Sequence, residues 1–392
     1  MTRGTDITDL PKIYKTENTC EFPDEITIRL TREAPLKYGE NPHQRAALYV
    51  VESAYQSERV RFEPVKIGKG GFSATNYMDF LGAALNTLKY FSDTTVVVNK
   101  HTKPSGFATL YPQHTDRSLV NLYKRARDAD ARSAFGSVVV FNVPVDMDTA
   151  HAITETLVDV VAAPNFDEGV LSHFEATKKN LRVLKYSGLE GMSKFRSHLA
   201  SRDFRYVGGG RALVQDQYLT NIKSAGDVIF DAIVWHHDKA HVVQRDPTPS
   251  EQQDMLTAWY GAICVPANAI VMVKDGVSVV VSSGQQERVG AVELGAVKGF
   301  QKMMDRKGLH FDALQGVGGG WVVLDPLTNP FAGAVAASDA FFPKPDSIDT
   351  LARIGVTGII QPGGSERDYE IIDAVNRHNM AMGITRERCF KH

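Results

Sequence analysis

The sequence is short of cysteine, of charge of one sign and of long hydrophobic runs. Only three of its 392 residues are cysteine: Cys20, Cys264 and Cys389. An odd number of widely separated cysteines does not suit a disulfide framework and favours a reducing compartment, so we expect a cytoplasmic protein. The 44 Lys and Arg residues nearly balance the 46 Asp and Glu residues, for a net charge of −2. This balance argues against nucleic acid or an anionic membrane surface as a partner.

Segments that would target the chain or anchor it in a membrane are also missing. The longest apolar stretch, residues 262–273, is interrupted by Pro266 and Asn268 and is too short to span a bilayer. The first residues lead into polar sequence without the apolar core of a signal peptide. We therefore expect a soluble, intracellular protein with no membrane partner.

The common cofactor and metal motifs are missing as well. The glycine-rich stretch 316–321 lacks the spacing of a dinucleotide fingerprint, and no glycine-rich loop ends in Lys-Ser or Lys-Thr. There is no Cys-x-x-Cys pair for a deaminase-type zinc site. On a helix, His237 and His241 would present two imidazoles one turn apart, with His236 beside them. No glutamate lies between them, so surface or capping histidines are the simpler interpretation, and no metal site is expected.

The composition and the hydrophobic patterns indicate an α/β fold. Hydrophobic residues make up 43% of the chain and charged residues 23%, as in globular proteins, and the length indicates two or three domains or subdomains. Runs of β-branched residues predict strands at 94–100, 136–141, 269–273 and 277–282, the last two joined by a hairpin turn at Asp275-Gly276. Apolar periodicity predicts helices at 77–90, 151–161, 291–304 and 366–378. This alternation is typical of a mixed sheet covered by helices.

Two weaker features concern the organisation of the chain. Residues 1–36 are polar with scattered prolines, and we interpret them as an extension rather than a domain. Ser133-Ala-Phe-Gly136 resembles Ser338-Asp-Ala-Phe-Phe342. Four residues do not establish a duplication and coincidence is the simpler explanation, although two similar α/β units would suit the length.

Polar stretches follow three of the predicted strands, where α/β proteins build their sites. Lys100-His101 closes a strand shortly before Pro104 and Gly106, so both side chains can converge on one cleft. A neighbouring cation also helps to keep an imidazole neutral, as a general base must be. Lys-His is nonetheless a common dipeptide, and by itself it is weak support for catalysis.

The other two stretches are also ambiguous by themselves. Residues 283–288 open a helix, and Arg288 lies 20 residues after Asn268; a solvated turn is the alternative. Residues 361–365, Gln-Pro-Gly-Gly-Ser, precede a helix with Ser365 as the expected N-cap and Asp368 three residues later. Free amides at this point would bind an anion, and an ordinary capped turn is the alternative.

Taken together, these segments resemble the transformylase portion of the bifunctional purine-biosynthesis enzymes, which formylate 5-aminoimidazole-4-carboxamide ribonucleotide (AICAR) and then close the ring to inosinate. The resemblance extends from about residue 37 to the C-terminus. The matching segments are Lys37-Tyr-Gly-Glu-Asn-Pro-His-Gln44, Lys100-His-Thr-Lys-Pro-Ser-Gly106, Asp130-Ala-Arg-Ser-Ala-Phe-Gly136, Asn268, Gly284-Gln-Gln-Glu-Arg288, Ser338-Asp-Ala-Phe-Phe-Pro343, Gln361-Pro-Gly-Gly-Ser365 and Arg388-Cys-Phe-Lys-His392.

The resemblance implies two cytidine-deaminase-like α/β/α subdomains with mixed sheets and no zinc, which we expect at residues 37–200 and 201–392. It also implies a homodimer with active sites at the subunit interface and 10-formyltetrahydrofolate as co-substrate. Some relatives bind a structural monovalent cation in addition. The N-terminal cyclohydrolase domain of the bifunctional enzymes has no counterpart in this sequence, so we expect a freestanding transformylase with a separate IMP cyclohydrolase as partner.

The resemblance further implies roles for particular residues. His101 would be the general base that takes a proton from the AICAR amine, while Lys100 stabilises the oxyanion or protonates the departing folate nitrogen. Asn268 would orient the acceptor or polarise the formyl oxygen. The residues that would bind the ribonucleotide are Lys37, Tyr38, Arg288, Phe341, Arg388, Phe390 and His392. Asp346, in the stretch that follows Pro343, would hold the folate pterin.

Some positions depart from the family pattern. Lys37 stands where Arg is usual, and Lys103 and Ser105 differ around the Lys-His turn. Asn165 and Ser187 stand where some members have Gly and an acceptor-contacting Asp. These changes keep two alternatives open: a related formyltransferase with a different donor or aminoimidazole acceptor, and a catalytically silent ligand-binding homologue. Retention of the Lys-His pair speaks against the silent homologue.

Overall fold

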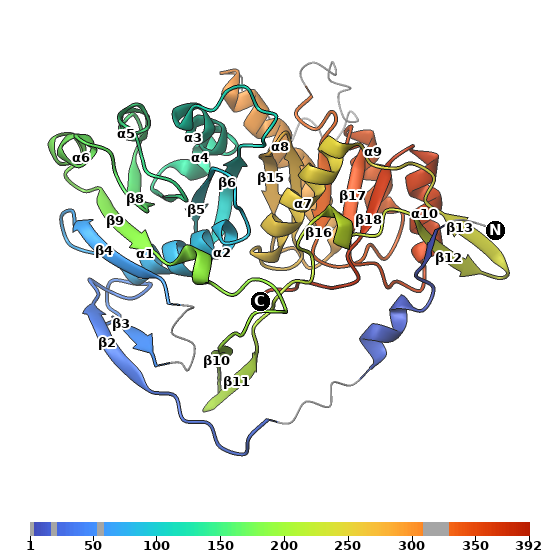
Figure 1. The fold of residues 1–392 in the computed structure, drawn as a ribbon, viewed down its shortest axis with the longest axis horizontal. Coiled ribbons are helices and arrows are strands. Elements are labelled where there is room, and N and C mark those ends of the chain that lie inside the picture. The colour runs from blue at the N-terminus through green and yellow to red at the C-terminus, as the bar shows by residue number, and fades with distance from the viewer. Residues whose placement is uncertain (1–3, 17–21, 53–58, 309–328) are drawn as a thin grey trace.

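The computed structural model describes residues 4–16, 22–52, 59–308 and 329–392. In this part of the chain, eleven strands form one mixed sheet in the order β18-β17-β16-β14-β15-β6-β5-β7-β8-β9-β4. Figure 1 shows this sheet running along the molecule, with the N-terminal half on the left and the C-terminal half on the right. The α/β class with a mixed sheet, predicted from the sequence, is confirmed.

The strands of the sheet are β4 (Arg61–Lys66), β5 (Thr95–Lys100), β6 (Lys103–Thr109), β7 (Ser137–Phe141), β8 (Val158–Ala163), β9 (Arg182–Ser187), β14 (Ile270–Lys274), β15 (Val277–Ser282), β16 (Val335–Ser338), β17 (Gly358–Gln361) and β18 (Ala381–Ile384). The helices around it are α1 (Ala74–Tyr77), the π-helix η3 (Met78–Ala84), α2 (Leu85–Leu88), α3 (Leu119–Asp128), α4 (Ala131–Ala134), α5 (Met147–Thr154), α6 (Val170–Thr177), α7 (Pro249–Ile263), α8 (Arg288–Arg306), α9 (Asp346–Arg353) and α10 (Asp368–Arg377). The other elements are β1 (Thr5–Asp6), η1 (Leu10–Lys15), β2 (Leu30–Pro35), β3 (Ala47–Val51), η4 (Leu189–Gly191), β10 (Arg202–Gly208), β11 (Arg211–Asp216), η5 (Ala225–Asp227), β12 (Ala232–His236) and β13 (Lys239–Val242).

The two halves of the sheet have the same topology. In each half a helical segment precedes an antiparallel hairpin, the first hairpin strand pairs antiparallel with a third strand, and two parallel strands follow. Hairpin β5–β6 thus corresponds to β14–β15, and β7, β8 and β9 correspond to β16, β17 and β18. The halves join where β6 pairs antiparallel with β15, at Ala108 and Val277.

This repeat is not the one that the short sequence echo suggested. Ser133–Gly136 precedes β7, whereas Ser338–Phe342 begins with the last residue of β16 and continues beyond that strand, so the two segments do not occupy equivalent positions. The repeated elements extend over residues 74–187 and 249–384. The subdomain limits of 37–200 and 201–392 stay a prediction.

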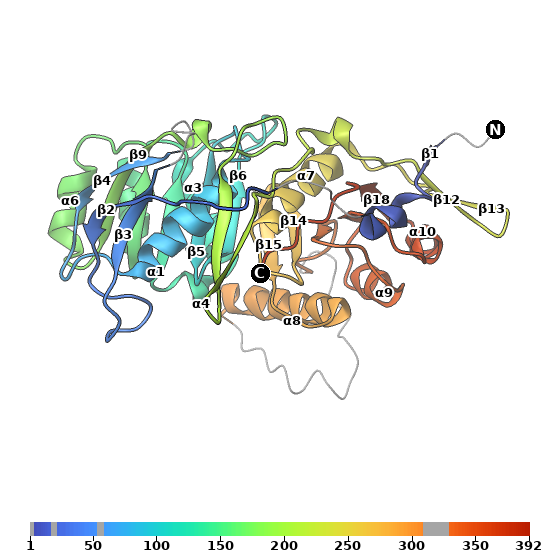
Figure 2. The ribbon, with the colours of Figure 1, turned by 90° about the horizontal axis from the view of Figure 1, so that it is seen from below.

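Both faces of the sheet are covered by helices, which explains the continuous β-branched runs. Val97 of β5 faces a core shared by the helices η3 and α7, and Val96 and Val98 face the opposite core under α3, α5 and α6. In the second half, α8, α9 and α10 cover a third core. Figure 2 shows α7 and α8 on opposite sides of the sheet. The architecture therefore has three layers, α/β/α.

Most of the secondary structure predicted from the sequence is confirmed. The four predicted strands correspond to β5, β7, β14 and β15, and the helices at 291–304 and 366–378 correspond to α8 and α10. The helix at 77–90 is present as α1, η3 and α2. The helix at 151–161 is wrong in its second part, because α5 ends at Thr154 and residues 158–161 belong to β8. Their β-branched side chains suit the buried strand better than a helix.

Three segments lie outside the sheet. The ribbons β2–β3 and β10–β11 project from the body (Figure 1), and Tyr49, Phe204 and Tyr206 on them are exposed. By contrast, the N-terminal segment packs on the second half, because β1 pairs with β12 and both Ile7 and Leu10 enter its core. None of the helices in the described ranges is long and apolar enough to cross a membrane.

Candidate active site

Most of the site residues expected from the sequence lie at one end of the strands. The first residue of β14, Ile270, pairs with Ser282 and Ser338, the last residues of β15 and β16. The end of β5 and the start of β6 lie at this same end, because Lys103 Nζ donates a hydrogen bond to Ser283 Oγ (2.9 Å) across the seam between the halves. The Lys-His turn of the first half and the loops after β15, β16 and β18 therefore share one end of the sheet.

A buried carboxylate fixes the turn that carries Lys100-His101. His101 and Thr102 have φ values of 55° and 64°, in the left-handed region that residues other than glycine seldom adopt. Asp79 of η3 accepts hydrogen bonds from the N–H groups of His101 (3.3 Å) and Thr102 (2.5 Å) and from Asn99 Nδ2 (3.0 Å). Burial raises the pKa of Asp79, although these hydrogen bonds favour its charged form. The carboxylate thus stabilises a turn with an unfavourable backbone conformation.

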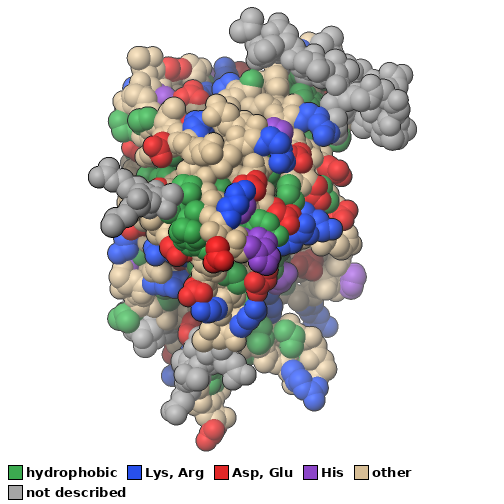
Figure 3. All heavy atoms as spheres, turned by 90° about the vertical axis from the view of Figure 1, so that its right-hand side faces the viewer, with side chains coloured by type: hydrophobic (Ala, Val, Ile, Leu, Met, Phe, Trp, Pro, Cys, Tyr) green, Lys and Arg blue, Asp and Glu red, His purple; other side chains and the backbone are tan. Residues whose placement is uncertain are grey.

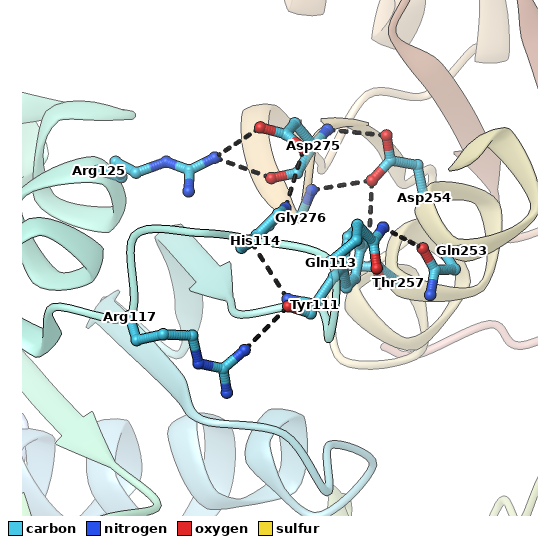
Figure 4. A network of polar contacts seen from close by, with 10 residues as sticks. All are labelled: Tyr111, Gln113, His114, Arg117, Arg125, Gln253, Asp254, Thr257, Asp275 and Gly276. Atoms are coloured by element: carbon cyan, nitrogen blue, oxygen red, sulfur yellow. Dashed lines mark hydrogen bonds and ion pairs between the residues drawn. The ribbon is translucent and has the colours of Figure 1, made fainter. Parts of the chain in front are cut away.

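The second half contains the same arrangement (Figure 4). Asp254 of α7 accepts hydrogen bonds from the N–H groups of Asp275 (2.8 Å) and Gly276 (2.8 Å), whose φ values are 52° and 72°. Asp254 precedes Asp275 by 21 residues, and Asp79 precedes His101 by 22. Burial raises the pKa of Asp254 too. Each half therefore holds its hairpin turn with an aspartate from the preceding helix.

The lysine at the end of each first strand is repeated as well. Lys100 Nζ donates to the carbonyl of Phe135, two residues before β7. Lys274 Nζ donates to the carbonyl of Ala332 (2.6 Å), three residues before β16, which is the counterpart of β7. Each half therefore contains the same three features: a lysine at the end of the first hairpin strand, a two-residue left-handed turn and a buried aspartate.

The two turns differ in what surrounds them. Asp275 accepts a hydrogen bond from Arg125 Nη2 (3.2 Å) and lies 2.9 Å from His114 Nε2, while Tyr111 donates to Asp254 (2.7 Å), as Figure 4 shows. All three partners come from the first half, so they tie the second turn to that half, although Asp275 itself stays exposed. His101 is exposed too, but within the described ranges its side chain forms no hydrogen bond or ion pair. The first turn thus carries an unengaged imidazole, whereas the second carries a carboxylate that is bound by the first half.

A second group of side chains surrounds Arg288. This guanidinium is only 7% exposed; Nη1 donates to Ser338 Oγ (2.6 Å) and pairs with Asp339 Oδ1 (2.6 Å), and Nη2 donates to Asn268 Oδ1 (2.6 Å). Asn268 Nδ2 in turn donates to the carbonyl of Gln285 (2.8 Å). Arg288 therefore orients Asn268, and its terminal nitrogens are engaged within the protein. Asp339 was not among the expected site residues, although it lies in one of the matching segments.

The C-terminal tail adds aromatic and cationic side chains beside Arg288. The guanidinium of Arg388 lies 4.4 Å from the ring centre of Phe390 and 5.5 Å from that of Tyr14. Phe390 also lies 6.0 Å from the Arg288 guanidinium and 5.7 Å from the ring of His392. The structure thus brings together most of the predicted residues of the second half, namely Asn268, Arg288, Arg388, Phe390 and His392.

Tyr14 is a member of this group that the sequence did not indicate. Its ring meets Phe341 edge-on at 5.6 Å, and its hydroxyl donates to the carbonyl of Gly363 (3.2 Å). A single aromatic residue in a polar segment has no periodic pattern that would identify it. The tail itself is fixed by the buried Glu387, which accepts a hydrogen bond from Tyr218 (3.0 Å).

The remaining predicted residues lie apart from these two groups. Lys37 is exposed, its Nζ lies 5.3 Å from the ring centre of Tyr38, and its N–H donates to the carbonyl of Phe72 (2.9 Å). Pro343 and Asp346 are exposed at the start of α9. Within the described ranges, no hydrogen bond or ion pair joins them to the Lys-His turn or to the Arg288 group.

Two of the positions that depart from the family pattern lie far from the Lys-His turn. Asn165 follows β8 and Ser187 ends β9. These strands are parallel to β7, whose first residues pair with the last residues of β5. Asn165 and Ser187 therefore lie at the other end of the strands and do not alter the surroundings of the turn.

The loop 361–365 differs from its sequence-based interpretation. Helix α10 begins at Asp368 with Arg367 before it, so the expected N-cap at Ser365 is wrong. The reason is that Asp368 Oδ2 accepts the N–H of Gly364 (2.7 Å) and so closes the loop from inside the helix. That amide is not free for an anion. The other glycine-rich stretch, 316–321, lies outside the described residues.

The three clustered histidines lie on a hairpin, so the helical spacing does not apply to them. His236 of β12 stacks on Tyr369 at 3.7 Å, and His241 Nδ1 lies 2.9 Å from Asp373 Oδ1. Figure 3 shows histidine side chains among charged ones on this end of the molecule. Among the residues that the structure describes, no three His, Cys, Asp or Glu side chains gather closely enough to hold a metal ion.

Comparison with known proteins gives one consistent result. Residues 8–298 match the model of a family described as AICARFT/IMPCHase bienzyme. The chain is 35% identical over 372 residues to the bifunctional purine biosynthesis protein PurH of Persephonella marina, covering 95% of the chain and 62% of that protein. It is 36% identical over 371 residues to the PurH protein of Magnetococcus marinus (95% and 62%) and 34% identical over 382 residues to that of Aquifex aeolicus (97% and 63%). The chain thus spans less than two thirds of the length of these relatives.

The paired aspartates allow a crossed test of the two turns. An Asn at position 79 keeps one acceptor but adds an N–H₂ donor, so at least one backbone N–H of the turn loses its partner, at a cost of about 1–2 kcal/mol. We expect Asp79→Asn to speed amide hydrogen exchange at His101 or Thr102 about tenfold and to leave Asp275 and Gly276 unchanged. Asp254→Asn should do the reverse. Unchanged protection of both His101 and Thr102 in Asp79→Asn would contradict the assignment.

The pH dependence of stability tests the loop at 361–365. Burial raises the pKa of Asp368 from 3.8 to about 6, and its Oδ1 has no hydrogen-bond partner among the described residues. The folded protein therefore binds this proton more tightly than the unfolded chain does. The resulting stability is fully present below about pH 4 and is lost as the pH rises through about 6, a loss of about 3 kcal/mol. Asp368→Asn should remove this loss in urea unfolding between pH 4 and 7, whereas Asp148→Asn, at an exposed position, should retain it. Parallel curves for wild type and Asp368→Asn would disprove the assignment.

Proposed function

Because the chain belongs to the AICARFT/IMPCHase bienzyme family, we propose that it transfers a formyl group from 10-formyltetrahydrofolate to the 5-amine of AICAR. The products are the formamido ribonucleotide FAICAR and tetrahydrofolate, within purine (IMP) biosynthesis. The proposal concerns formyl transfer alone, since the chain spans 62% of the length of relatives named bifunctional. The observation that carries it is the pairing of the half-buried Lys100 with the exposed His101 on the turn held by Asp79, at the same strand end as Asn268.

His101 is the proposed general base. The AICAR amine is conjugated with its ring and carboxamide, so it is a weak nucleophile that must lose a proton as it attacks the formyl carbon. The imidazole of His101 is exposed, and within the described ranges no carboxylate forms an ion pair with it. Its ring nitrogens are therefore available to the acceptor, while Asp79 fixes the backbone from which the ring extends.

Lys100 is the proposed source of positive charge in the second step. Attack of the amine gives a tetrahedral oxyanion, and its collapse breaks the bond from the formyl carbon to folate N10, which must gain a proton. Lys100 uses one of its three donors on the carbonyl of Phe135. The other donors can stabilise the oxyanion or protonate N10. Asn268 retains one free N–H on Nδ2 and would orient the acceptor or polarise the formyl oxygen.

We propose the residues that bind the ribonucleotide and the folate from the exposure of their side chains. Arg388 is exposed and stacked on Phe390, which suits a phosphate and an imidazole ring, and Phe341 lies half-buried beside them. His392, in contact with Phe390, belongs to the same group. The exposed carboxylate of Asp346 can accept the N–H groups of a pterin.

We also propose a cytoplasmic homodimer of two cytidine-deaminase-like subdomains. The repeated topology supports the two subdomains. Tyr49, Phe204 and Tyr206 support the dimer, because they expose 48%, 57% and 71% of their surface on the projecting ribbons, where a second copy can cover them. A dimer would also allow Lys37 and Tyr38 to join a site in the partner subunit. Cys264 and Cys389 are free thiols, as expected in a reducing compartment.

The proposal is tested by tetrahydrofolate release with AICAR and 10-formyltetrahydrofolate, followed by mass identification of the nucleotide. His101→Asn is the sharpest variant, because Asn tolerates the left-handed backbone at this position and cannot act as a base. We expect His101→Asn to lower kcat about 10²- to 10⁴-fold, Lys100→Ala to lower it strongly, and Lys274→Ala, at the equivalent lysine beside the second turn, to leave it nearly unchanged.

Two outcomes would contradict parts of the proposal. Wild-type turnover in a folded His101→Asn variant would remove His101 as the base. Absence of product from the folded wild-type protein would exclude this donor and acceptor. Because Lys37 and Lys103 depart from the family pattern, turnover with another formyl donor or aminoimidazole would then favour a related formyltransferase, and binding of AICAR without turnover would favour a silent homologue.

A further inference from the structure

A small cavity lies beside the Lys-His turn, at the seam between the two halves. Its volume is about 120 Å³, and its walls include Lys100, Lys103, Ser283 and Lys298. A nucleoside or a pterin needs a pocket several times larger. The cavity therefore suits a ligand of only a few heavy atoms.

The charges around this cavity are not balanced. Lys100 and Lys103 lie opposite each other in the β5–β6 register, so their side chains share one face of the hairpin. Their hydrogen-bond partners are neutral, namely the carbonyl of Phe135 and Ser283 Oγ. Lys298 of α8 faces them and has no ion-pair partner among the described residues. Like charges that face each other in this way destabilise a hairpin unless an anion lies between them.

The one carboxylate in the cavity wall does not supply the missing charge. Asp130 forms an ion pair with the buried Lys302 (3.0 Å) and also accepts hydrogen bonds from the N–H (3.1 Å) and hydroxyl (2.9 Å) of Ser133. Burial, and to a smaller extent the charge of Lys298, lower the pKa of Lys103. Three ammonium groups thus face a cavity whose only carboxylate is already paired.

We propose that this cavity binds a small dianionic oxyanion of the phosphate class, with Lys103 and Lys298 as its main ligands and Ser283 beside them. A tetrahedral dianion matches the volume and the uncompensated charge, and each ammonium group retains donors for it. The anion is either free inorganic phosphate or the phosphate group of a ribonucleotide. Anion binding does not depend on the formyl transfer. Any effect of the anion on catalysis by the neighbouring His101 rests on the proposed function.

The second hairpin supplies a matched control. In its register Lys274 lies opposite Val277, where the first hairpin has Lys100 opposite Lys103. The repeated lysine is therefore present in both hairpins, but the cationic pair is present only in the first. Lys274→Gln removes the same charge as Lys103→Gln without touching the cavity.

The test is a titration of the full chain with inorganic phosphate at low ionic strength, without folate or nucleotide, followed by calorimetry and ³¹P NMR. We expect one saturable site in wild type, weakened about tenfold or more by Lys103→Gln and by Lys298→Gln, and changed less than about twofold by Lys274→Gln. Lys103→Arg should retain binding. Urea unfolding of each variant in phosphate-free buffer shows whether it is folded.

Different results would test the anion site, the identity of its occupant and the proposed function separately. Absence of saturable phosphate binding, or equal weakening in folded Lys103→Gln and Lys274→Gln, would overturn the site. Displacement of bound phosphate by ribose 5-phosphate would identify a ribonucleotide phosphate as the occupant, and lack of displacement would identify the free anion. A protein that binds phosphate at this site but transfers no formyl group would contradict the proposed function and leave the anion site standing.

Discussion

Two hairpin turns in this protein are each held by a buried carboxylate that, among the described residues, has no lysine or arginine paired with it. Burying such a charge costs free energy, which is why burial raises the pKa of both Asp79 and Asp254. Backbone N–H groups offset that cost, and they come from residues whose left-handed conformation is itself unfavourable. Carboxylate and turn therefore depend on each other. In the first half, these hydrogen bonds fix the backbone position of His101.

The same device serves different purposes in the two halves. In the second half, Arg125 and His114 of the first half bind Asp275, so this turn joins the halves. In the first half, the turn carries an exposed imidazole that has no hydrogen bond or ion pair within the described ranges, where its counterpart carries the Asp275 carboxylate. Because the halves are joined at β6 and β15, the loop after β15 reaches the first turn, and Lys103 meets Ser283 there. The turn at Asp275, which is structural, and the turn at His101, which we propose to be reactive, thus have the same backbone arrangement.

The sequence predicted the features that depend on local patterns. Buried β-branched runs identified four strands, and Asp275-Gly276 identified a hairpin turn. The prediction of a helix at 151–161 was wrong because β8 begins only a few residues after α5, and the apolar residues at this junction suit either a helix or a strand. The local patterns did not establish the duplication, because Lys100-His-Thr and Lys274-Asp-Gly share geometry and little sequence. Only the family resemblance implied two similar subdomains. Nor was Asp79, since a single acidic residue on an apolar helix shows its purpose only when the turn packs against it.

We infer that the turn held by Asp79 positions the reactive imidazole and that its counterpart held by Asp254 is structural. The most direct test compares kcat for AICAR formylation in Asp79→Asn and Asp254→Asn, with urea unfolding to show that both are folded. We expect kcat to fall at least about tenfold in Asp79→Asn and to change within about threefold in Asp254→Asn, because small misplacements of a catalytic group are costly. Equal effects of the two substitutions on kcat would contradict this inference.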